Sequence, residues 1–175
     1  MLCPRKMLRC RDDRRAGILG DHVVQRQRLR AQRVPNPRQS DGQPRECVIK
    51  IESHADVVVA RRKGRSMAME IGFDPRDLTR ITAAISELAG NIIAYAKRGE
   101  IILTRMDQES RQGIAVVGRD DGPGILDVSQ AMRDGFSTTG RLGLGLPGVR
   151  RLMDEFEILS EPGRGTAVTV KKWMS

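Results

Sequence analysis

The clearest pattern in the chain is a series of apolar residues at helical spacing that begins just after Asp74. Apolar side chains that recur every three or four positions lie on one face of an α-helix. Asp74 suits the N-cap, Pro75 suits the first helical position, and Gly99 is expected to end the helix as its C-terminal glycine. The predicted buried face consists of Leu78, Ile81, Ile85, Leu88, Ile92 and Tyr95.

Shorter patterns on either side of this helix predict strands and further helices. The alternating, β-branched segment CVIKIE (47–52) is typical of a strand, and the polar stretch Asp107–Gln112 predicts the turn of a hairpin. The expected strands cover residues 47–52, 100–106, 113–119, 157–160 and 166–171, and the other expected helices cover residues 54–72, 128–133 and 146–156. This order favours an α+β two-layer sandwich, with a mixed, mostly antiparallel sheet and helices on one face.

The positive charge of the chain is concentrated in its first 45 residues. The formal charge of the 175 residues is +9, and residues 1–45 contain 12 Lys and Arg against 4 Asp and Glu. The other 130 residues contain 19 basic and 18 acidic side chains and are nearly neutral. Low hydrophobicity and high charge predict a basic, disordered tail over residues 1–45 and a globular domain over residues 46–175.

Two interpretations of the tail stay open. The first is a basic arm for nucleic acid or acidic lipid. The second is a segment without such a role, either a solvated tail or residues translated upstream of the domain's natural start. No aromatic residue is interleaved with the basic residues of 1–45 to stack on bases, so the sequence predicts no nucleic-acid partner.

Cysteine usage and hydropathy indicate the compartment. Cys3, Cys10 and Cys47 form no CxxC spacing, so neither a disulfide framework nor a zinc site is expected. No apolar run approaches the ~18–20 residues that span a bilayer, and residues 1–20 lack the apolar core of a secretory signal. We therefore expect a cytoplasmic protein that does not enter a membrane.

Glu87 and Asn91 form the first polar feature with chemical potential. A spacing of four residues puts both side chains on one flank of the long helix, one turn apart. A carboxylate beside an amide oxygen can act as a base and can hold a hard cation. A solvated helix flank is the alternative, and the pair alone does not decide between the two.

Two glycine-containing turns bring polar groups to strand ends. The segment DDGPG (120–124) follows a predicted strand, and a carboxylate there can accept a hydrogen bond from an exocyclic amine such as that of adenine. The segment GRGT (163–166) leads into the last predicted strand, where Thr166 can form hydrogen bonds. Each segment alone is also compatible with an ordinary turn.

The segment RLGLGLPG (141–148) combines alternate glycines with the start of a predicted helix. Because glycine has no Cβ, the amides of residues 143–146 can turn toward one anion, which a helix N-terminus attracts. The small, polar residues 136–141 before it suit a mobile lid. The expected phosphate contacts are Arg141, Gly143, Leu144, Gly145 and Leu146.

The same glycines also match the GxGxxG pattern of dinucleotide-binding folds. That pattern requires a strand directly before it and an acidic residue at the end of the next strand. The preceding FSTTGR is no strand, and this interpretation leaves the other three segments without a role. We therefore set it aside.

Taken in order, the four segments resemble the boxes that build one ATP site in the GHKL superfamily. They read Glu87/Asn91, Asp120-x-Gly122-x-Gly124, Gly143-x-Gly145 and Gly163-x-Gly165-Thr166. The resemblance covers residues 47–175 and implies the Bergerat ATP-binding fold. Segments such as DGFSTTGRLGLGLPGVRRLMDEF make it most similar to the compact bacterial anti-sigma serine/threonine kinases, and among them to the switch kinases of stress-signalling complexes.

The resemblance implies roles at the reacting end of the site. Glu87 would be the general base toward a serine or threonine hydroxyl, and Asn91 would coordinate Mg²⁺. Gly143 and Gly145 would lend amides to the phosphates of ATP, and Arg141 would lie near the γ-phosphate.

It also implies roles at the base end. Asp120 would accept a hydrogen bond from the adenine amino group, and Gly122 and Gly124 would shape the pocket around it. Thr166 would assist Asp120. The implied cofactors are therefore ATP and Mg²⁺.

The implied partners are proteins. The resemblance implies phosphorylation of a small STAS-domain antagonist, and activation of a PP2C-type phosphatase by binding once the kinase is free of that antagonist. The alternative is an anti-sigma factor, a nucleotide-gated binding module that sequesters a sigma factor. A basic nucleic-acid binder is the third hypothesis, and it depends on the charge of +9.

Overall fold

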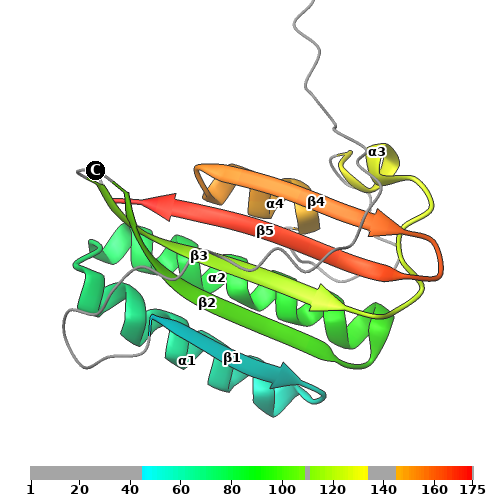
Figure 1. Ribbon diagram of the computed structural model, residues 1–175, viewed down its shortest axis with the longest axis horizontal. Helices are drawn as coiled ribbons and strands as arrows, with labels where there is room; N and C mark the ends of the chain where they lie inside the picture. The colour runs from blue at the N-terminus through cyan, green and yellow to red at the C-terminus, as the bar shows by residue number, and fades with distance from the viewer. Residues whose placement is uncertain (1–44, 109–110, 134–144, 175) are drawn as a thin grey trace, which may run out of the picture. The chain divides into compact units, whose positions relative to one another are not determined.

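The computed structural model describes residues 45–108, 111–133 and 145–174. Within them, five strands form one sheet in the order β1-β2-β3-β5-β4, and each neighbouring pair is antiparallel (Figure 1). The strands are β1 (Glu46–Ile51), β2 (Gly99–Gln108), β3 (Arg111–Asp120), β4 (Glu155–Glu161) and β5 (Gly165–Trp173). The expected sheet is confirmed, although its described strand pairs are all antiparallel rather than mixed.

Three helices cover one face of the sheet, as the two-layer prediction requires (Figure 1). They are α1 (His54–Ile71), α2 (Pro75–Asn91) and α4 (Gly145–Leu152). A further short helix, α3 (Val128–Ala131), follows the turn after β3. Among the described residues, no helix is long and apolar enough to cross a membrane.

Local sequence explains where the two long helices begin and end. The side chain of Asp74 accepts a hydrogen bond from the Asp77 amide at 2.8 Å, and Pro75 occupies the first turn of α2, as predicted. Gly72 ends α1 with φ 108°, a left-handed conformation that favours glycine. Between the two helices, a Cβ at Gly64 would lie 2.1 Å from Cδ1 of Ile85, so glycine allows their close packing.

The C-terminal end of the long helix differs from the prediction. The α-helix stops at Asn91 and continues as one π-helical turn, Ile92–Ala96, which the Lys97 amide closes by donating to the carbonyl five residues back at 2.9 Å. Lys97 adopts φ 69°, and Gly99 begins β2 instead of ending the helix. A π-turn holds more residues than an α-turn, so it rotates later side chains out of phase. Tyr95 is therefore 45% exposed rather than part of the buried face.

The end of α4 also differs from the prediction. The helix expected over residues 146–156 ends at Leu152, and Phe156 belongs to β4. The Asp154 amide already donates to the Lys171 carbonyl at 2.9 Å, which begins the pairing with β5. Strand pairing thus overrides a local pattern that is compatible with a helix.

The hydrophobic core lies between the sheet and the helix layer. It is almost wholly aliphatic, as expected from a chain with 3% aromatic residues. The largest fully buried side chains are Ile51, Ile81, Ile85, Ile101, Leu103, Ile114, Val116, Val149 and Val170. Each contributes about 1.5–3 kcal/mol by leaving water, and together they fix α2 against β2 and β3.

Candidate functional site

Glu87 and Gly145 meet where α2 and α4 come together. The Gly145 amide donates a hydrogen bond to Oε2 of Glu87, with an N–O distance of 3.2 Å. Gly145 is the first residue of α4 and has φ 59°, so glycine is favoured there. A carboxylate at this place is stabilised by the N-terminal end of the helix dipole. The structure thus brings the acid of the long helix to the glycine-rich segment.

Asn91 and Leu88 place this flank of α2 relative to the sheet. Leu88 packs on β3, because a Cβ at Gly118 would lie 3.1 Å from the Leu88 Cβ. Asn91 is the last residue of α2 and lies half-buried, one helical turn beyond Glu87. Glu87 and Asn91 therefore belong to the last turns of α2, the part of the helix that packs on β3 through Leu88.

The turn after β3 is built from glycines that admit no side chain. The Gly122 amide donates to Oδ1 of Asp120 at 2.9 Å, which closes the turn. A Cβ at Gly122 would lie 2.6 Å from the Cβ of Ala96, so the π-turn after α2 packs directly on this turn. Gly124 has φ 69°, and a Cβ there would lie 2.2 Å from the Glu161 carbonyl oxygen.

The turn before β5 is docked onto the turn after β3. The Gly163 amide donates to the Pro123 carbonyl at 2.8 Å. A Cβ at Gly165, which has φ 92°, would lie 2.0 Å from the Asp120 carbonyl oxygen. Asp120 and Thr166 are partners in the β3–β5 register. The second and fourth sequence motifs, 120–124 and 163–166, therefore form one structural unit.

Ser160 belongs to this unit, although sequence reasoning did not single it out. Its hydroxyl accepts a hydrogen bond from the Ile125 amide at 2.8 Å and lies 2.9 Å from Oγ1 of Thr166. It also donates to the Gly165 carbonyl at 3.1 Å. The signal in the sequence is a hydroxyl at the end of a strand beside the GRGT turn, but only the register reveals its partners.

Asp120 has a perturbed electrostatic environment. Burial raises the pKa of its carboxyl group above the ordinary value, and the negative charge of Asp121 acts in the same direction. Hydrogen bonds from the Gly122 and Thr166 backbones lower the pKa and offset part of this rise. A partly desolvated carboxylate at a turn without side chains is a strong acceptor for a donor group on a ligand.

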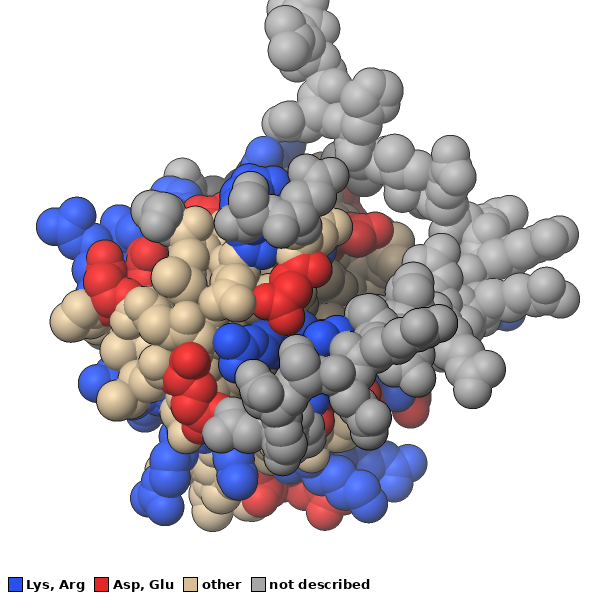
Figure 2. Space-filling view, turned by 60° about the vertical axis from the view of Figure 1, so that its left-hand side comes forward, with Lys and Arg blue, Asp and Glu red and all other residues tan. Residues whose placement is uncertain are grey.

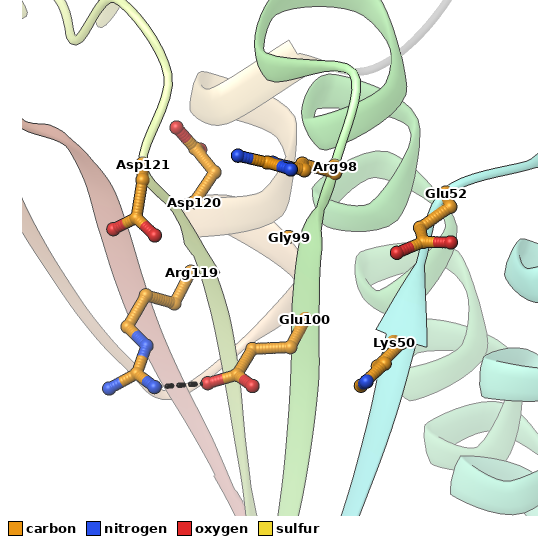
Figure 3. A pocket seen from close by; sticks show the side chains of 8 residues that line it. All are labelled: Lys50, Glu52, Arg98, Gly99, Glu100, Arg119, Asp120 and Asp121. Carbon is orange, nitrogen blue, oxygen red and sulfur yellow. Dashed lines mark ion pairs between the residues drawn. The ribbon is translucent and has the colours of Figure 1, made fainter.

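A polar cavity of about 220 Å³ lies next to this unit, at the ends of β1, β2 and β3 (Figure 3). Its lining consists of Lys50, Glu52, Arg98, Gly99, Glu100, Arg119, Asp120 and Asp121. Arg119 and Glu100 form an ion pair across it (Figure 3). Of the predicted site residues that the structure describes, Asp120 alone lines this cavity, so the cavity adjoins that set rather than containing it.

The remaining predictions have different outcomes. Arg141, Gly143 and Leu144, with the segment 136–141, lie outside the described residues. Leu146 lies in the first turn of α4, and its side chain packs against the core. Among the residues that the structure describes, no cluster of three or more His, Cys, Asp or Glu could hold a metal ion.

Comparison with protein families agrees with this geometry. Residues 52–172 match the histidine kinase-like ATPase domain, which is most of the described part of the chain. The chain therefore belongs to the histidine kinase-like ATPase family.

The chain is also similar to individual proteins of known name. The chain is 48% identical over 129 residues to the serine/threonine-protein kinase RsbT of Bacillus subtilis, covering 74% of this chain and 97% of that protein. It is 33% identical over 129 residues to the anti-sigma F factor of Caldanaerobacter subterraneus subsp. tengcongensis, covering 70% of this chain and 85% of that protein. The fold resembles a crystal structure of the RsbU and RsbW domains of a Mycobacterium tuberculosis protein. There the TM-score is 0.51 at 20% identity, over 76% of this chain and 34% of that one.

Proposed function

We propose that this chain is an ATP- and Mg²⁺-dependent serine/threonine protein kinase that acts by partner switching. Its family membership and its likeness to a serine/threonine kinase support this function. The observation that carries it is the contact between Glu87 and Gly145, because it joins an acid to a backbone anion site. Such a pair unites the two groups that phosphoryl transfer requires, a base and a phosphate contact.

The residues at the start of α4 fit a phosphate group. In the structure the Gly145 amide already binds an anion, the Glu87 carboxylate, so the helix terminus accepts a negatively charged oxygen. Gly145 and Leu146 would hold phosphate oxygens here, together with Gly143, Leu144 and Arg141. Bound ATP supplies the phosphoryl group, and Mg²⁺ neutralises the charge on its phosphates.

Mg²⁺ fits a small set of oxygen ligands. This cation usually takes one or two protein oxygens and completes its coordination with phosphate and water. Asn91 would supply an amide oxygen from the last turn of α2, near the carboxylate of Glu87. The absence of a cluster of three acidic or imidazole ligands among the described residues is compatible with this mode of binding.

The turns around Asp120 fit an adenine ring. Asp120 presents a carboxylate whose burial makes a hydrogen bond from a ligand donor favourable. Gly122 and Gly124 let Ala96 and the Glu161 backbone pack directly on this turn, which fixes its position, and Thr166 stands in register with Asp120. We assign the adenine amino group to Asp120 on this basis.

Glu87 would take the proton from the attacking hydroxyl of the protein substrate. A partly exposed carboxylate can do so when the hydroxyl lies within hydrogen-bond distance and in line with the transferred group. Most of the rate enhancement in such a site comes from positioning and charge neutralisation rather than covalent chemistry. The elements α2, α4 and β3 supply this positioning.

The proposed partners follow the relatives. A STAS-domain antagonist is the proposed substrate, and a PP2C-type phosphatase is the proposed second partner. The likeness to anti-sigma F factors favours an alternative, a nucleotide-gated module that binds a sigma factor. Basic and acidic side chains are interspersed over the face in Figure 2, which does not favour a nucleic-acid surface on that face.

Phosphotransfer from γ-labelled ATP to a purified STAS-domain antagonist tests the function. Glu87→Gln should lower the rate at least about a hundredfold, because general base catalysis contributes that much or more. Glu70→Gln is the matched control, since Glu70 is exposed on α1 and contacts Ser66. Equal transfer by wild type and Glu87→Gln refutes the assignment, and capture of a sigma factor without transfer to the antagonist supports the alternative.

A further inference from the structure

The contact between Glu87 and Gly145 has a consequence for nucleotide binding. One amide N–H makes one good hydrogen bond, and the Gly145 N–H donates to Oε2 of Glu87. In the proposed function the same amide donates to a phosphate oxygen. The carboxylate and the phosphate are therefore alternative partners of a single donor.

We propose that the Glu87 carboxylate competes with the nucleotide phosphates for the Gly145 amide, so that nucleotide binding releases the carboxylate for its work as a base. This inference rests on the proposed function and adds a regulatory role for the same residue. While Oε2 of Glu87 accepts the hydrogen bond from the Gly145 amide, the lone pair that it uses is unable to accept a proton from a substrate hydroxyl. Its release couples base activation to the presence of nucleotide.

The packing of α2 and α4 makes this contact specific. At the other end of the two helices, Lys172 lies 2.6 Å from Oδ1 of Asp154 and 3.7 Å from Oδ1 of Asp77. Lys172 and Asp77 are both buried. The bridge thus joins the start of α2 to the residues just after α4.

The contacts at the two ends of α2 involve the two ends of α4. Asp77 and Glu87 are ten residues, or about 15 Å, apart on α2, whereas Gly145 begins α4 and Asp154 lies two residues beyond its end at Leu152. The two helices therefore run antiparallel and are tied near both ends. Displacement of one tie by phosphate leaves the other in place, so α4 keeps its position while the Glu87 side chain is freed.

The hydrogen bond between Glu87 and the Gly145 amide is strong enough to change the apparent affinity for nucleotide measurably. A hydrogen bond to a charged acceptor is stronger than one between neutral groups, and the helix dipole adds to it. Glu87 is partly exposed, so its carboxylate can turn into water when a phosphate replaces it. The contact therefore lowers the apparent nucleotide affinity without preventing binding.

The first experiment measures the contact without nucleotide. Amide hydrogen exchange and the amide proton shift of Gly145 are compared by NMR in the full chain, in wild type, Glu87→Gln and Glu87→Ala. We expect exchange at Gly145 to be at least about fivefold faster in Glu87→Ala, with Glu87→Gln between the two, since a neutral acceptor makes a weaker hydrogen bond. Identical exchange rates and shifts in all three proteins overturn the proposal.

The second experiment measures competition with ADP by calorimetry in the presence of a chelator. ADP lacks the γ-phosphate, so it carries less negative charge near Glu87 than ATP does, and chelation removes any effect of a bound cation. We expect Glu87→Ala to bind ADP about three- to tenfold more tightly than wild type, because a charged competitor has been removed.

Asp121→Asn is the matched control for charge. Asp121 lies beside Asp120 in the cavity lining, so its substitution removes one negative charge near the site and leaves the Gly145 contact intact. An equal gain in ADP affinity in Asp121→Asn and Glu87→Ala overturns competition in favour of a general charge effect. Equal affinity in wild type and Glu87→Ala overturns it outright.

The two experiments also separate this inference from the proposed function. If ADP binds neither wild type nor variant, the proposed function and the competition both fail. If ADP binds, but neither amide exchange at Gly145 nor ADP affinity changes when Glu87 is substituted, the proposed competition fails and the kinase proposal stands. Glu87→Gln preserves the shape of the side chain and guards against a loss of folding in Glu87→Ala.

Discussion

The amide of Gly145 donates to the carboxylate of Glu87 across 58 positions of sequence, at 3.2 Å. This contact joins the helix that carries the proposed base to the helix that carries the proposed phosphate amides. Both helices lie on the same side of β3, whose end carries Asp120 (Figure 1). The site is therefore a property of how α2, α4 and β3 pack, and substitutions at each can be tested separately.

Asp120→Asn should make the folded protein more stable and weaken its binding of nucleotide. Burial raises the pKa of this carboxyl group, so the folded state holds its proton to higher pH than the unfolded state. The stability that the protonated form contributes is complete below the unfolded pKa of about 3.9 and is lost as pH rises through the raised value. At neutral pH the substitution should raise the free energy of unfolding by at most about 0.5 kcal/mol, because the side chain is partly exposed and solvent screens its charge.

The same substitution should weaken nucleotide binding at least about tenfold, since a hydrogen bond to a charged acceptor is lost. Thermal unfolding without nucleotide and calorimetry with ADP measure the two effects. A variant that is less stable than wild type at neutral pH and binds ADP with equal affinity contradicts both the electrostatic and the adenine assignments.

Gly165→Ala should be strongly destabilising. Gly165 has φ 92°, and a Cβ there would lie 2.0 Å from the Asp120 carbonyl oxygen, a backbone atom that is unable to move alone. We expect a loss of roughly 2–4 kcal/mol in the free energy of unfolding, from backbone strain and the clash together. Gly163→Ala is the control, because Gly163 has φ 77° but no atom within 4 Å of a Cβ.

Denaturant unfolding followed by the fluorescence of Trp173, the single tryptophan, compares the two variants. Gly163→Ala should lose only about 1 kcal/mol, from strain alone. Similar losses in both variants would show that the contact between the two turns contributes nothing beyond the strain.

Glu155 should contribute to acid sensitivity. Hydrogen bonds from the side chains of Lys171 and Trp173 lower the pKa of its carboxyl group. The stability that they provide is present above the unfolded pKa of about 4.3 and is lost as pH falls through the lowered value. Glu155 is half-exposed, so we expect Glu155→Gln to lose about 0.5–1 kcal/mol at neutral pH.

The difference between wild type and Glu155→Gln should begin to shrink near the unfolded pKa of about 4.3 and approach zero only below the lowered folded pKa, where the carboxyl group is protonated in both states. Urea unfolding at a series of pH values, again followed by Trp173, measures it. A difference that stays constant down to pH 2 would assign the loss to packing rather than to charge.

Lys172→Met should destabilise the fold, because it removes the cation that links the start of α2 to the residues just after α4. The Lys172 side chain is 10% exposed, and its loss leaves Asp154 and the 10%-exposed side chain of Asp77 with one cation fewer. We expect a loss of roughly 1–3 kcal/mol in unfolding free energy, because a buried charge pair is lost while Asp77 keeps its ion pair with Arg80 and Asp154 keeps the hydrogen bond from the Trp173 amide. Lys171→Met is the control and should cost less than about 1 kcal/mol, since the Lys171–Glu155 pair is solvent-accessible. Equal losses in calorimetric unfolding would argue against a special role for the buried bridge.

Local sequence patterns were sufficient for most of the elements. The N-cap at Asp74, the end of α1 at Gly72 and most of the buried face of α2 depend on residues within a turn or two of each other. The predicted end of the long helix was wrong. Gly99 is the local residue that most resembles a helix stop, but the α-helix ends before it and a π-turn connects α2 to β2, which begins at Gly99. Packing of Ala96 against Gly122, which lies in another element, favours this turn.

The motifs of the candidate site could be predicted from the sequence, but the long-range contacts between them could not. The spacing of Glu87 and Asn91 and the glycines of the turns are local signals, and the structure places them around the ends of α2, α4 and β3. The local signal at Ser160, a hydroxyl at a strand end, was not sufficient, because its partner amide at Ile125 lies 35 positions away and is brought near by strand order. Long-range hydrogen bonds of this kind follow from sheet register, which a single sequence encodes only through the whole fold.

The strand order also shapes how such a protein can diversify. Because β5 lies between β3 and β4, the chain from Asp121 to Asp154 leaves the sheet at one end and returns at the other, passing through α3 and α4 on the way. This crossover carries DGPG and the start of α4, whereas the register of all five strands depends on residues outside it. Substitutions at exposed positions of this crossover can therefore alter the proposed nucleotide contacts without changing the pairing of the strands.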